Sequence, residues 1–390
     1  MIEQKEIIDH RSSIFDYNPT TRVVFGENTI TQLGKLTNEL SGKRVLLITD
    51  DGLRKTGHVD KALEALKGES IECAIFQEVE ENPTTQHVEK GVQFARENSP
   101  IDVIIGLGGG SAMDCAKGIN FILTNGGKMA DYWGVGKATK PMLPSIGIPT
   151  TAGTGSEAQS FALIAKEDSH QKMACGDKKA SFRVVILDPT LLASVPRKVA
   201  AVTGLDAISH AIESYVSTKR NPLSQMYSRE AWRLLSANYE KSLDNPDDLQ
   251  ALGNMQLGAH WAGAAIENSM LGAAHACANP LTANFDITHG IAVGLMLPHI
   301  IRFNSRTVNG DYKDLAEIAG LQAGSGAVSL AKQITRLTEK NDLPVKLAEC
   351  NINESALEGL AREAAQQWTG KFNPRPVGEA ELLELYKNAM

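Results

Sequence analysis

Two short stretches of the sequence combine residue types that bind divalent metal ions. In VTGLDAISHAIES, Asp206 and His210 are four residues apart, so on a helix their side chains share one face. In LGAAHACANPLTANFDITHG, His275 and His289 lie among small and apolar residues, which let a ligand approach closely. One carboxylate and three imidazoles suit a borderline ion such as Fe²⁺ or Zn²⁺ and leave positions open for a substrate.

Spacing alone does not select these residues over the other histidines of the chain. The others are His10, His58, His87, His170, His260 and His299. A D-x-x-x-H pair on an amphipathic helix is, by itself, more often a satisfied polar pair than a pair of metal ligands. At this point two interpretations of these residues are open: a set of metal ligands, or polar side chains that only satisfy each other within the fold.

A glycine-rich turn follows one of the expected strands, in DVIIGLGGGSAMDCAKG. Gly108, Gly109 and Gly110 permit positive φ and remove the Cβ atoms that would keep the backbone away from a phosphate. Ser111 then stands where a helix N-terminus offers free N–H groups to an anion. The spacing is not G-x-G-x-x-G, and the turn follows a later strand than the usual dinucleotide fingerprint, so a purely structural turn is the alternative.

Two further strand ends carry polar side chains. Asp50 ends RVLLITD, where a carboxylate accepts hydrogen bonds from ribose hydroxyls and repels a 2′-phosphate. The alternative is a helix-capping role, with Asp51 as a rival. The loop IPTTAGTGSE offers the hydroxyls of Thr150, Thr151 and Thr154, although such clusters are often plain loops. Because ligands bind at the carboxyl ends of parallel strands, the three strand ends together predict a nucleotide site.

The elements that position these residues follow from the apolar pattern. Short β-branched runs predict strands at residues 22–26, 43–50, 71–76, 102–110, 144–151 and 183–189. Amphipathic segments at 58–68 and 85–98 separate some of them, which predicts βαβ units and a mostly parallel sheet. In the second half of the chain, apolar residues recur with a period near 3.6, which is typical of amphipathic helices. We therefore expect an α/β nucleotide-binding domain over 1–193 and an all-helical, metal-binding domain over 194–390.

Bulk composition narrows the class of protein. A chain of 390 residues is long for one hydrophobic core, which agrees with two domains. The net charge of −7 argues against a nucleic-acid or anionic-membrane partner. No apolar run is long enough to span a bilayer, and the N-terminal MIEQKEIIDHRSS lacks a signal-peptide core. Five scattered cysteines form no C-x-x-C pair, so we expect a reducing, cytoplasmic location.

Five segments, taken in order, resemble the iron-containing (group III) alcohol dehydrogenases. They are GLGGGSAMDCAK, IPTTAGTGSE, DPTLLASVP, TGLDAISHAIE and GAAHACANPL…THG…LPH, and the resemblance covers nearly the whole chain. It implies a dinucleotide-binding α/β domain followed by an all-helical domain, the architecture of the dehydroquinate synthases. It also implies Fe²⁺, with Zn²⁺ as the alternative, NAD as hydride carrier, and a homodimer or higher homo-oligomer.

The resemblance assigns roles to individual positions. The implied metal ligands are Asp206, His210, His275 and His289. The implied cofactor-binding residues are Asp50, Asn82, Gly109, Gly110, Ser111, Thr150, Thr151, Thr154, Phe161, Leu163 and Lys172. Within that set, Lys172 matches a lysine near the nicotinamide ribose, Asp50 matches the acid of members that prefer NAD, and Asn82 is matched by the segment ENPT alone.

One position departs from the resemblance. Many members of the family carry a second histidine four residues after the ligand that His275 matches, where it faces the substrate. This chain has Asn279 there. An amide forms hydrogen bonds but does not shuttle a proton near neutral pH. Asn279 either orients a polar substrate or is simply a helix-end residue before Pro280.

The expected function is a metal-assisted, reversible hydride transfer between a small primary alcohol and NAD, giving an aldehyde or, with a secondary alcohol, a ketone. One alternative is a polyol or hydroxy-acid dehydrogenase of the same architecture. Another is a dehydroquinate synthase-like lyase, which the lack of a basic cluster near the helical ligands disfavours. The last is a nucleotide-binding protein with a degenerate site, against which the intact Asp/His₃ set argues.

Overall fold

The computed structural model describes residues 15–168, 171–322, 324 and 326–390. The N-terminal stretch without a signal-peptide core, together with His10 and His170, lies outside the described residues. In the part of the chain that is described, no helix has the length and apolar character needed to cross a bilayer.

The chain divides into two compact units that are interleaved in sequence. The sheet unit comprises Thr20–Ala207 and Leu234–Gly263. The helical unit comprises Ile208–Arg233, the described residues of Ala264–Met390, and residues 15–19. The expected domain boundary near residue 193 stays a prediction.

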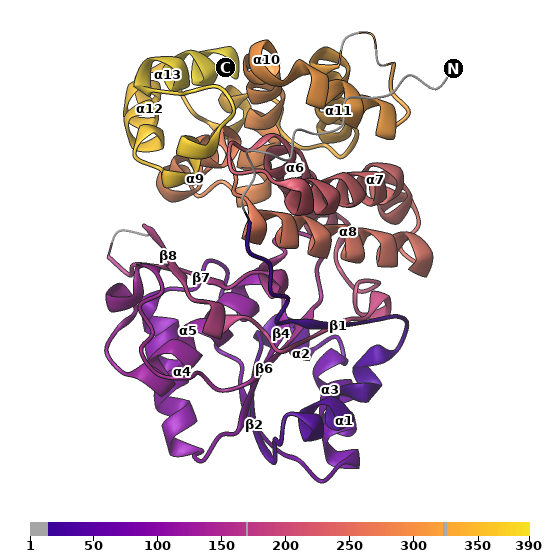
Figure 1. Ribbon diagram of the computed structural model, residues 1–390, viewed down its shortest axis with the longest axis vertical. Coiled ribbons are helices and arrows are strands. Elements are labelled where there is room, and N and C mark those ends of the chain that lie inside the picture. Colours follow the sequence, from indigo (N-terminus) through magenta and orange to yellow (C-terminus); the bar gives the residue numbers. More distant parts are fainter. Residues whose placement is uncertain (1–14, 169–170, 323, 325) are drawn as a thin grey trace. The chain divides into compact units, whose positions relative to one another are not determined.

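The sheet unit is built on a six-stranded parallel sheet (Figure 1). Its strands are β1 (Arg22–Phe25), β2 (Arg44–Ile48), β3 (Glu72–Phe76), β4 (Val103–Gly108), β6 (Ser145–Pro149) and β9 (Val184–Leu187). They lie in the order β1-β9-β6-β4-β2-β3, and every neighbouring pair is parallel. The six expected strands are thus confirmed, and so is the mostly parallel sheet.

Helices cover both faces of this sheet (Figure 1). On one face, α1 (Leu33–Glu39) and α3 (His58–Gly68) contribute buried side chains to a shared core. On the other, α4 (Thr85–Glu97) and α5 (Gly110–Asn125) do the same. Burial on both faces explains why VIIGLG and SIGIP are continuous apolar runs rather than alternating ones.

A second, three-stranded sheet was not expected from the sequence. It has the order β5-β8-β7, from β5 (Gly134–Val135), β7 (Phe161–Ala165) and β8 (Lys172–Gly176). Strands β7 and β8 pair antiparallel, with Leu163 opposite Ala174 and Ala165 opposite Lys172. This pairing places the expected cofactor residues Phe161, Leu163 and Lys172 on one hairpin.

After β9 the described residues form no strand, which confirms the all-helical second half. The helices are α6 (Arg197–Val216), α7 (Pro222–Asp244), α8 (Leu249–Asn268), α9 (Ala273–Phe285), α10 (His289–Ile318), α11 (Ala327–Lys340), α12 (Leu357–Ala365) and α13 (Glu379–Asn388). Within the helical unit, α9 packs against α10 and α12, and α10 packs against α11. Buried Tyr386 donates its hydroxyl to the Cys277 carbonyl at 2.7 Å, which ties α13 to α9.

Candidate metal and nucleotide site

Three of the four expected metal ligands form a tight, buried group. Asp206 and His210 are one turn apart on α6, and His275 is near the start of α9. These side chains are 5%, 5% and 3% exposed. One ligand atom from each lies within 4.8 Å of the others. The division between the two units falls inside α6, but this helix is continuous, so Asp206 keeps its place one turn from His210.

The fourth expected ligand, His289, adjoins this group as the first residue of α10. Its ring centroid lies 5.3 Å from that of His275, and the His275 and His210 rings stack at 4.9 Å. The structure therefore brings three imidazoles together from three helices of one unit, although their role as ligands stays a prediction.

Glu213 belongs to the same group, and sequence reasoning missed it. Its carboxylate is buried; Oε2 lies 2.5 Å from His275 Nδ1, and Oε1 accepts the Ala274 N–H at 2.7 Å. Because a carboxylate only accepts, Nδ1 carries the proton and Nε2 keeps its lone pair for a metal. A signal was present: Asp206, His210 and Glu213 follow an i, i+4, i+7 spacing, which is one helix face.

The donor chemistry of this group fits a borderline divalent cation. A carboxylate oxygen with imidazole nitrogens is a usual set for Zn²⁺ and Fe²⁺. A ligating histidine usually donates its other N–H to a carboxylate, as His275 does to Glu213. The types of donor atom and the hydrogen bond from His275 to Glu213 therefore both indicate a metal site.

The glycine-rich turn lies beside the two other strand ends that the sequence singled out. Gly108 has φ +151°, and a Cβ atom on it would lie 3.5 Å from Asp50 Oδ2. A Cβ atom on Gly110 would lie 2.6 Å from Thr154 Cγ2. The Thr150 N–H donates to the Gly108 carbonyl at 2.9 Å. These predicted residues therefore meet at the carboxyl ends of the strands.

The same turn opens helix α5. Gly109 is its N-cap, so Gly110 and Ser111 form the first turn, where backbone N–H groups are free to bind an anion. Thr151 Oγ1 lies 3.6 Å from the place of a Gly109 Cβ. A side chain here would occupy the space between the turn and the threonine loop.

Asp50 fills the helix-capping role that the sequence offered as the alternative, and its second carboxylate oxygen lies toward the glycine turn. Its Oδ1 accepts the Leu53 N–H at 2.8 Å, as the N-cap of α2 (Asp51–Arg54), while Oδ2 lies on the side of Gly108. Its rival Asp51 instead pairs with Lys55 at the surface, and that hydrogen bond lowers the pKa of Asp51. Of the two acids, Asp50 lies nearer the glycine turn.

The hairpin β7–β8 carries a lysine whose charge interacts with acidic side chains of this region. Burial lowers the pKa of the Lys172 ammonium, while the carboxylates of Asp114, Asp206 and Glu81 oppose that shift. Asn82 has φ +53° in the turn before Pro83, whose carbonyl accepts the Ala165 N–H at 2.9 Å.

Lys117 is a second residue that sequence reasoning missed. It is 1% exposed, and its Nζ donates to the carbonyls of Ser156 and Phe161, each at 2.7 Å. The Ser156 hydroxyl in turn donates to Asp114. This charged side chain joins the threonine loop to strand β7. The only sequence signal was D-x-x-K in the buried helix α5.

The threonine loop also packs closely on helix α8. Buried His260 and Glu157 form a pair at 3.2 Å, and Gln256 donates to the Pro149 carbonyl at 3.0 Å. A Cβ on Gly263 would lie 2.4 Å from the Gly155 carbonyl oxygen, a distance that real side chains do not adopt. Gly155 itself has φ +60°. The loop is therefore held by backbone-to-backbone contact.

This close contact predicts whether a substitution at Gly263 stabilises or destabilises the protein. Gly263→Ala is expected to destabilise the protein by about 1–3 kcal/mol, because overpacking against backbone exceeds the helix-propensity gain. Gly359→Ala, at an exposed site of α12 with open space around it, is expected to stabilise by about 0.5–1 kcal/mol. Urea unfolding followed by circular dichroism measures both. A neutral or stabilising Gly263→Ala would contradict the contact.

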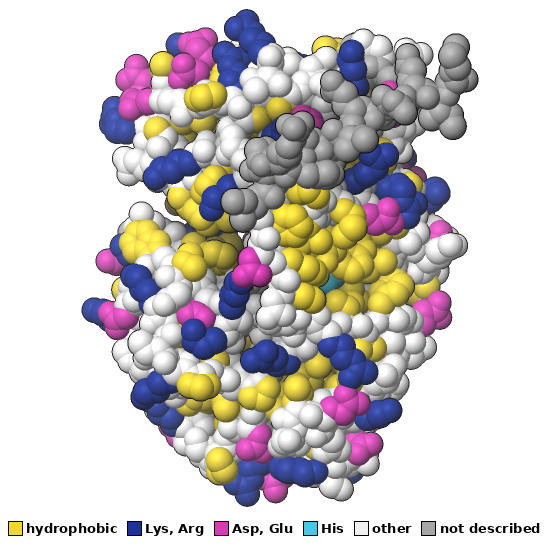
Figure 2. Space-filling view, in the orientation of Figure 1, with side chains coloured by type: hydrophobic (Ala, Val, Ile, Leu, Met, Phe, Trp, Pro, Cys, Tyr) yellow, Lys and Arg dark blue, Asp and Glu magenta, His cyan; other side chains and the backbone are white. Residues whose placement is uncertain are grey.

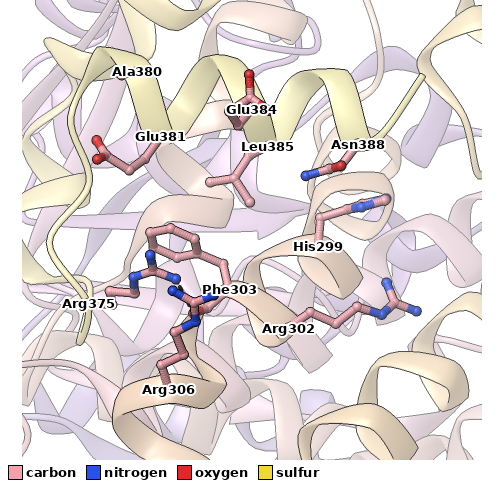
Figure 3. Close-up of a pocket in the computed structure, with 10 residues that line it drawn as sticks. All are labelled: His299, Arg302, Phe303, Arg306, Arg375, Ala380, Glu381, Glu384, Leu385 and Asn388. Carbon is pink, nitrogen blue, oxygen red and sulfur yellow. Dashed lines mark hydrogen bonds between the residues drawn. The ribbon is translucent and has the colours of Figure 1, made fainter.

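A separate groove lies within the helical unit (Figure 3). It has a volume of about 640 Å³ and is lined by His299, Arg302, Phe303, Arg306, Arg375, Ala380, Glu381, Glu384, Leu385 and Asn388. Figure 3 shows arginine side chains from α10 and the segment before α13 on one side, and the glutamates of α13 on the other. His299 lies roughly 15 Å along α10 from His289. The groove is therefore not the metal site.

Comparisons with known proteins agree with the geometry. The family described as iron-containing alcohol dehydrogenase matches residues 19–189, and its C-terminal family matches residues 200–390. Alcohol dehydrogenase 4 of Schizosaccharomyces pombe is 34% identical, over 94% of this chain and 87% of that protein. The NAD-dependent methanol dehydrogenase of Bacillus methanolicus is 31% identical, over 94% and 97%. A crystal structure of 1,3-propanediol oxidoreductase superposes with a TM-score of 0.92, at 34% identity, over 97% and 100% of the two chains.

Proposed function

Because the chain belongs to the iron-containing alcohol dehydrogenase family, an enzyme family that uses iron and NAD, we propose that it interconverts small primary alcohols and their aldehydes. NAD-linked alcohol oxidation is the activity that this membership supports. The observation that carries the proposal is the buried Asp206–His210–His275 group with Glu213 behind it.

The proposed metal ligands are Asp206, His210 and His275, with His289 as the fourth. A cation bound there supplies Lewis-acid polarisation of the substrate oxygen, and NAD supplies the hydride acceptor. Glu213 keeps the His275 proton on Nδ1, so Nε2 remains a ligand. Burial of Asp206, His210 and His275 keeps bulk water away from their donor atoms, which strengthens every electrostatic interaction there.

The nucleotide is proposed to lie along the strand ends of the sheet unit. The N–H groups of Gly110 and Ser111 bind the pyrophosphate, and Asp50 accepts from the adenosine ribose. The residues proposed to surround the rest of the cofactor are Asn82, Gly109, Thr150, Thr151, Thr154, Phe161, Leu163 and Lys172. Close backbone approach at the glycines supports this placement.

A direct test uses protein purified without oxygen. Elemental analysis is expected to find Fe²⁺ or Zn²⁺ near one per chain, and NADH absorbance is expected to rise with a panel of primary alcohols. Redox-neutral conversion of a substrate would point to a lyase instead. Tight NAD binding without turnover of any alcohol or aldehyde would reject the enzyme proposal.

Removing the charge behind His275 is expected to weaken the metal. Glu213→Gln, whose amide no longer demands a proton on Nδ1, should lower metal affinity about 10- to 100-fold. Competition with a chromogenic chelator measures the change. Glu230→Gln is the control, because Glu230 pairs with Arg233 at the surface. Equal affinity in both variants would contradict the role of Glu213.

We also propose a homo-oligomer. Strand β1 is an edge strand, so one side of its backbone is unpaired within the sheet, and Phe25 at its end is 46% exposed. Figure 2 shows hydrophobic side chains gathered over α8, and Phe25 packs beside Gly253 of that helix. An exposed apolar area next to an open strand edge favours association of two copies.

A further inference from the structure

Positive charge is concentrated on one wall of the groove in the helical unit (Figure 3). Arg302 and Arg306 are one turn apart on α10, and Arg375 is in the segment before α13; all three line the groove. We call these three side chains the basic wall. Figure 3 shows the guanidinium groups of Arg306 and Arg375 directed to each other beside the Phe303 ring. Because guanidinium groups stay protonated, the wall is cationic although the chain has a net charge of −7.

Arg375 is held in place at both its backbone and its side chain. Its guanidinium carbon lies 3.7 Å from the centroid of the Phe303 ring, and Nη1 donates to the Phe303 carbonyl at 2.9 Å. The Arg375 carbonyl accepts from Asn373 Nδ2 at 2.6 Å. Asn373 is buried and pairs with the buried Asn304 amide through hydrogen bonds of 3.0 and 2.7 Å. Because this guanidinium is preorganised, a ligand that binds it loses little affinity to side-chain ordering.

The acidic side chains of the groove do not neutralise the basic wall. Glu381 Oε2 accepts the Gly378 N–H at 2.9 Å, and Glu384 Oε1 accepts from Lys387 Nζ at 3.0 Å. Figure 3 shows both glutamates on α13, across the groove from the basic wall. Among the residues that the structure describes, no carboxylate forms an ion pair with any of the three arginines. The wall therefore keeps its charge for a ligand.

The chemistry of the basic wall matches a phosphate group. Like charges that face each other repel, and an anion between them replaces this repulsion with attraction. Each guanidinium donates two parallel N–H groups to an oxyanion. A phosphate group has at least three free oxygens and nearly two negative charges, so it accepts from both Arg306 and Arg375. A carboxylate has two oxygens and one charge, which one guanidinium already satisfies.

We propose that the basic wall binds the phosphate group of a small molecule, at a site separate from the metal group. Arg306 lies roughly 25 Å along α10 from His289, so the proposal does not depend on the proposed function. Two sources supply this chemistry. One is inorganic phosphate, and the other is a phosphate ester whose hydroxyl groups donate to Glu381 and Glu384 across the groove.

The test is a phosphorus NMR titration of inorganic phosphate with Zn²⁺-loaded protein saturated with NADH, so that the nucleotide site is occupied. The variants are Arg306→Gln and Arg375→Gln. Arg306 is exposed, so its replacement leaves the fold intact even if loss of Arg375 does not. Arg233→Gln is the control, because Arg233 is an exposed arginine of the same unit that pairs with Glu230. All of these proteins keep the metal and nucleotide residues, so a difference between them arises at the groove.

The wild type and Arg233→Gln are expected to bind phosphate with a Kd of about 1 mM or tighter, and each groove variant about tenfold more weakly. Acetate is expected to bind the wild type about tenfold more weakly than phosphate does. Tighter binding of glycerol 1-phosphate would assign the site to a phosphate ester, and binding no tighter than that of phosphate would assign it to inorganic phosphate. No saturable binding by the wild type, equal binding by Arg306→Gln, or equal binding of acetate and phosphate would overturn the proposal.

Discussion

Replacing His275 with alanine is expected to lower kcat/KM for alcohols by about 10³-fold or more, because a Lewis-acid cation contributes several kcal/mol to such a transition state. The substitution removes one donor from a group whose atoms lie within 4.8 Å of one another. It also leaves the buried Glu213 carboxylate without its imidazole partner. Metal content should fall together with activity. Elemental analysis and steady-state NADH assays on the same preparation measure both.

The matched control is His299→Ala, ten positions into α10. Burial lowers the pKa of His299 to about 4, so alanine removes no charge at neutral pH. Activity and metal content are expected to stay within about twofold, as for a change that spares the transition-state contacts. Full metal retention and turnover in His275→Ala would reject the proposed ligand set. The mutant's circular dichroism spectrum shows whether folding, rather than the metal, has been lost.

Asp50→Ser is expected to raise kcat/KM for NADPH relative to NADH by about 10- to 100-fold, because a carboxylate near the ribose repels a 2′-phosphate. Serine also has a side-chain oxygen, so the N-cap residue of α2 still accepts a hydrogen bond from the Leu53 N–H. The change therefore isolates the charge from the capping role. Initial rates with the two cofactors, at a fixed alcohol concentration, measure the ratio.

Asp51→Ser removes a carboxylate from the next position and serves as the control. Asp51 pairs with Lys55 in solvent, so its loss should leave the cofactor ratio unchanged. A shift of equal size in both variants would mean that net charge alone acts, which would contradict the placement of Asp50. An unchanged ratio in Asp50→Ser would remove it from the cofactor site.

The parallel sheet could be predicted from sequence because its strands are buried on both faces. Segments such as VIIGLG and VVIL are continuous apolar runs, a pattern with few alternatives when glycine and proline bound it. The hairpin β7–β8 could not be predicted in the same way. KMACG begins with a charged lysine, and Leu163 in FALIA is 40% exposed, so neither segment has the uniform burial of β4, β6 and β9.

Individual site residues could be predicted only where several side chains of metal-binding type lie close together in the sequence. Asp206 and His210 share a helix turn, but His275 reaches them only through packing of α6 and α9. Glu213 shares their helix face, yet a single glutamate on a helix is ordinary in sequence. Asn279 lies within α9 and donates to Gln367, 88 positions away in the sequence, a contact that no local pattern reports.

The five cysteines also determine how the thiol groups of the enzyme respond to oxidation in air. All are free thiols, and burial raises the pKa of each, to about 12 for Cys73 and Cys175 and well above the usual value for Cys115 and Cys277. Cys115, Cys175 and Cys277 are buried, and a protonated, enclosed sulfur reacts slowly with peroxide or alkylating agents, whereas Cys73 and Cys350 are half-buried. We therefore expect the three buried thiols to stay reduced in air, and Cys73 and Cys350 to be the ones that oxidants and alkylating agents reach first.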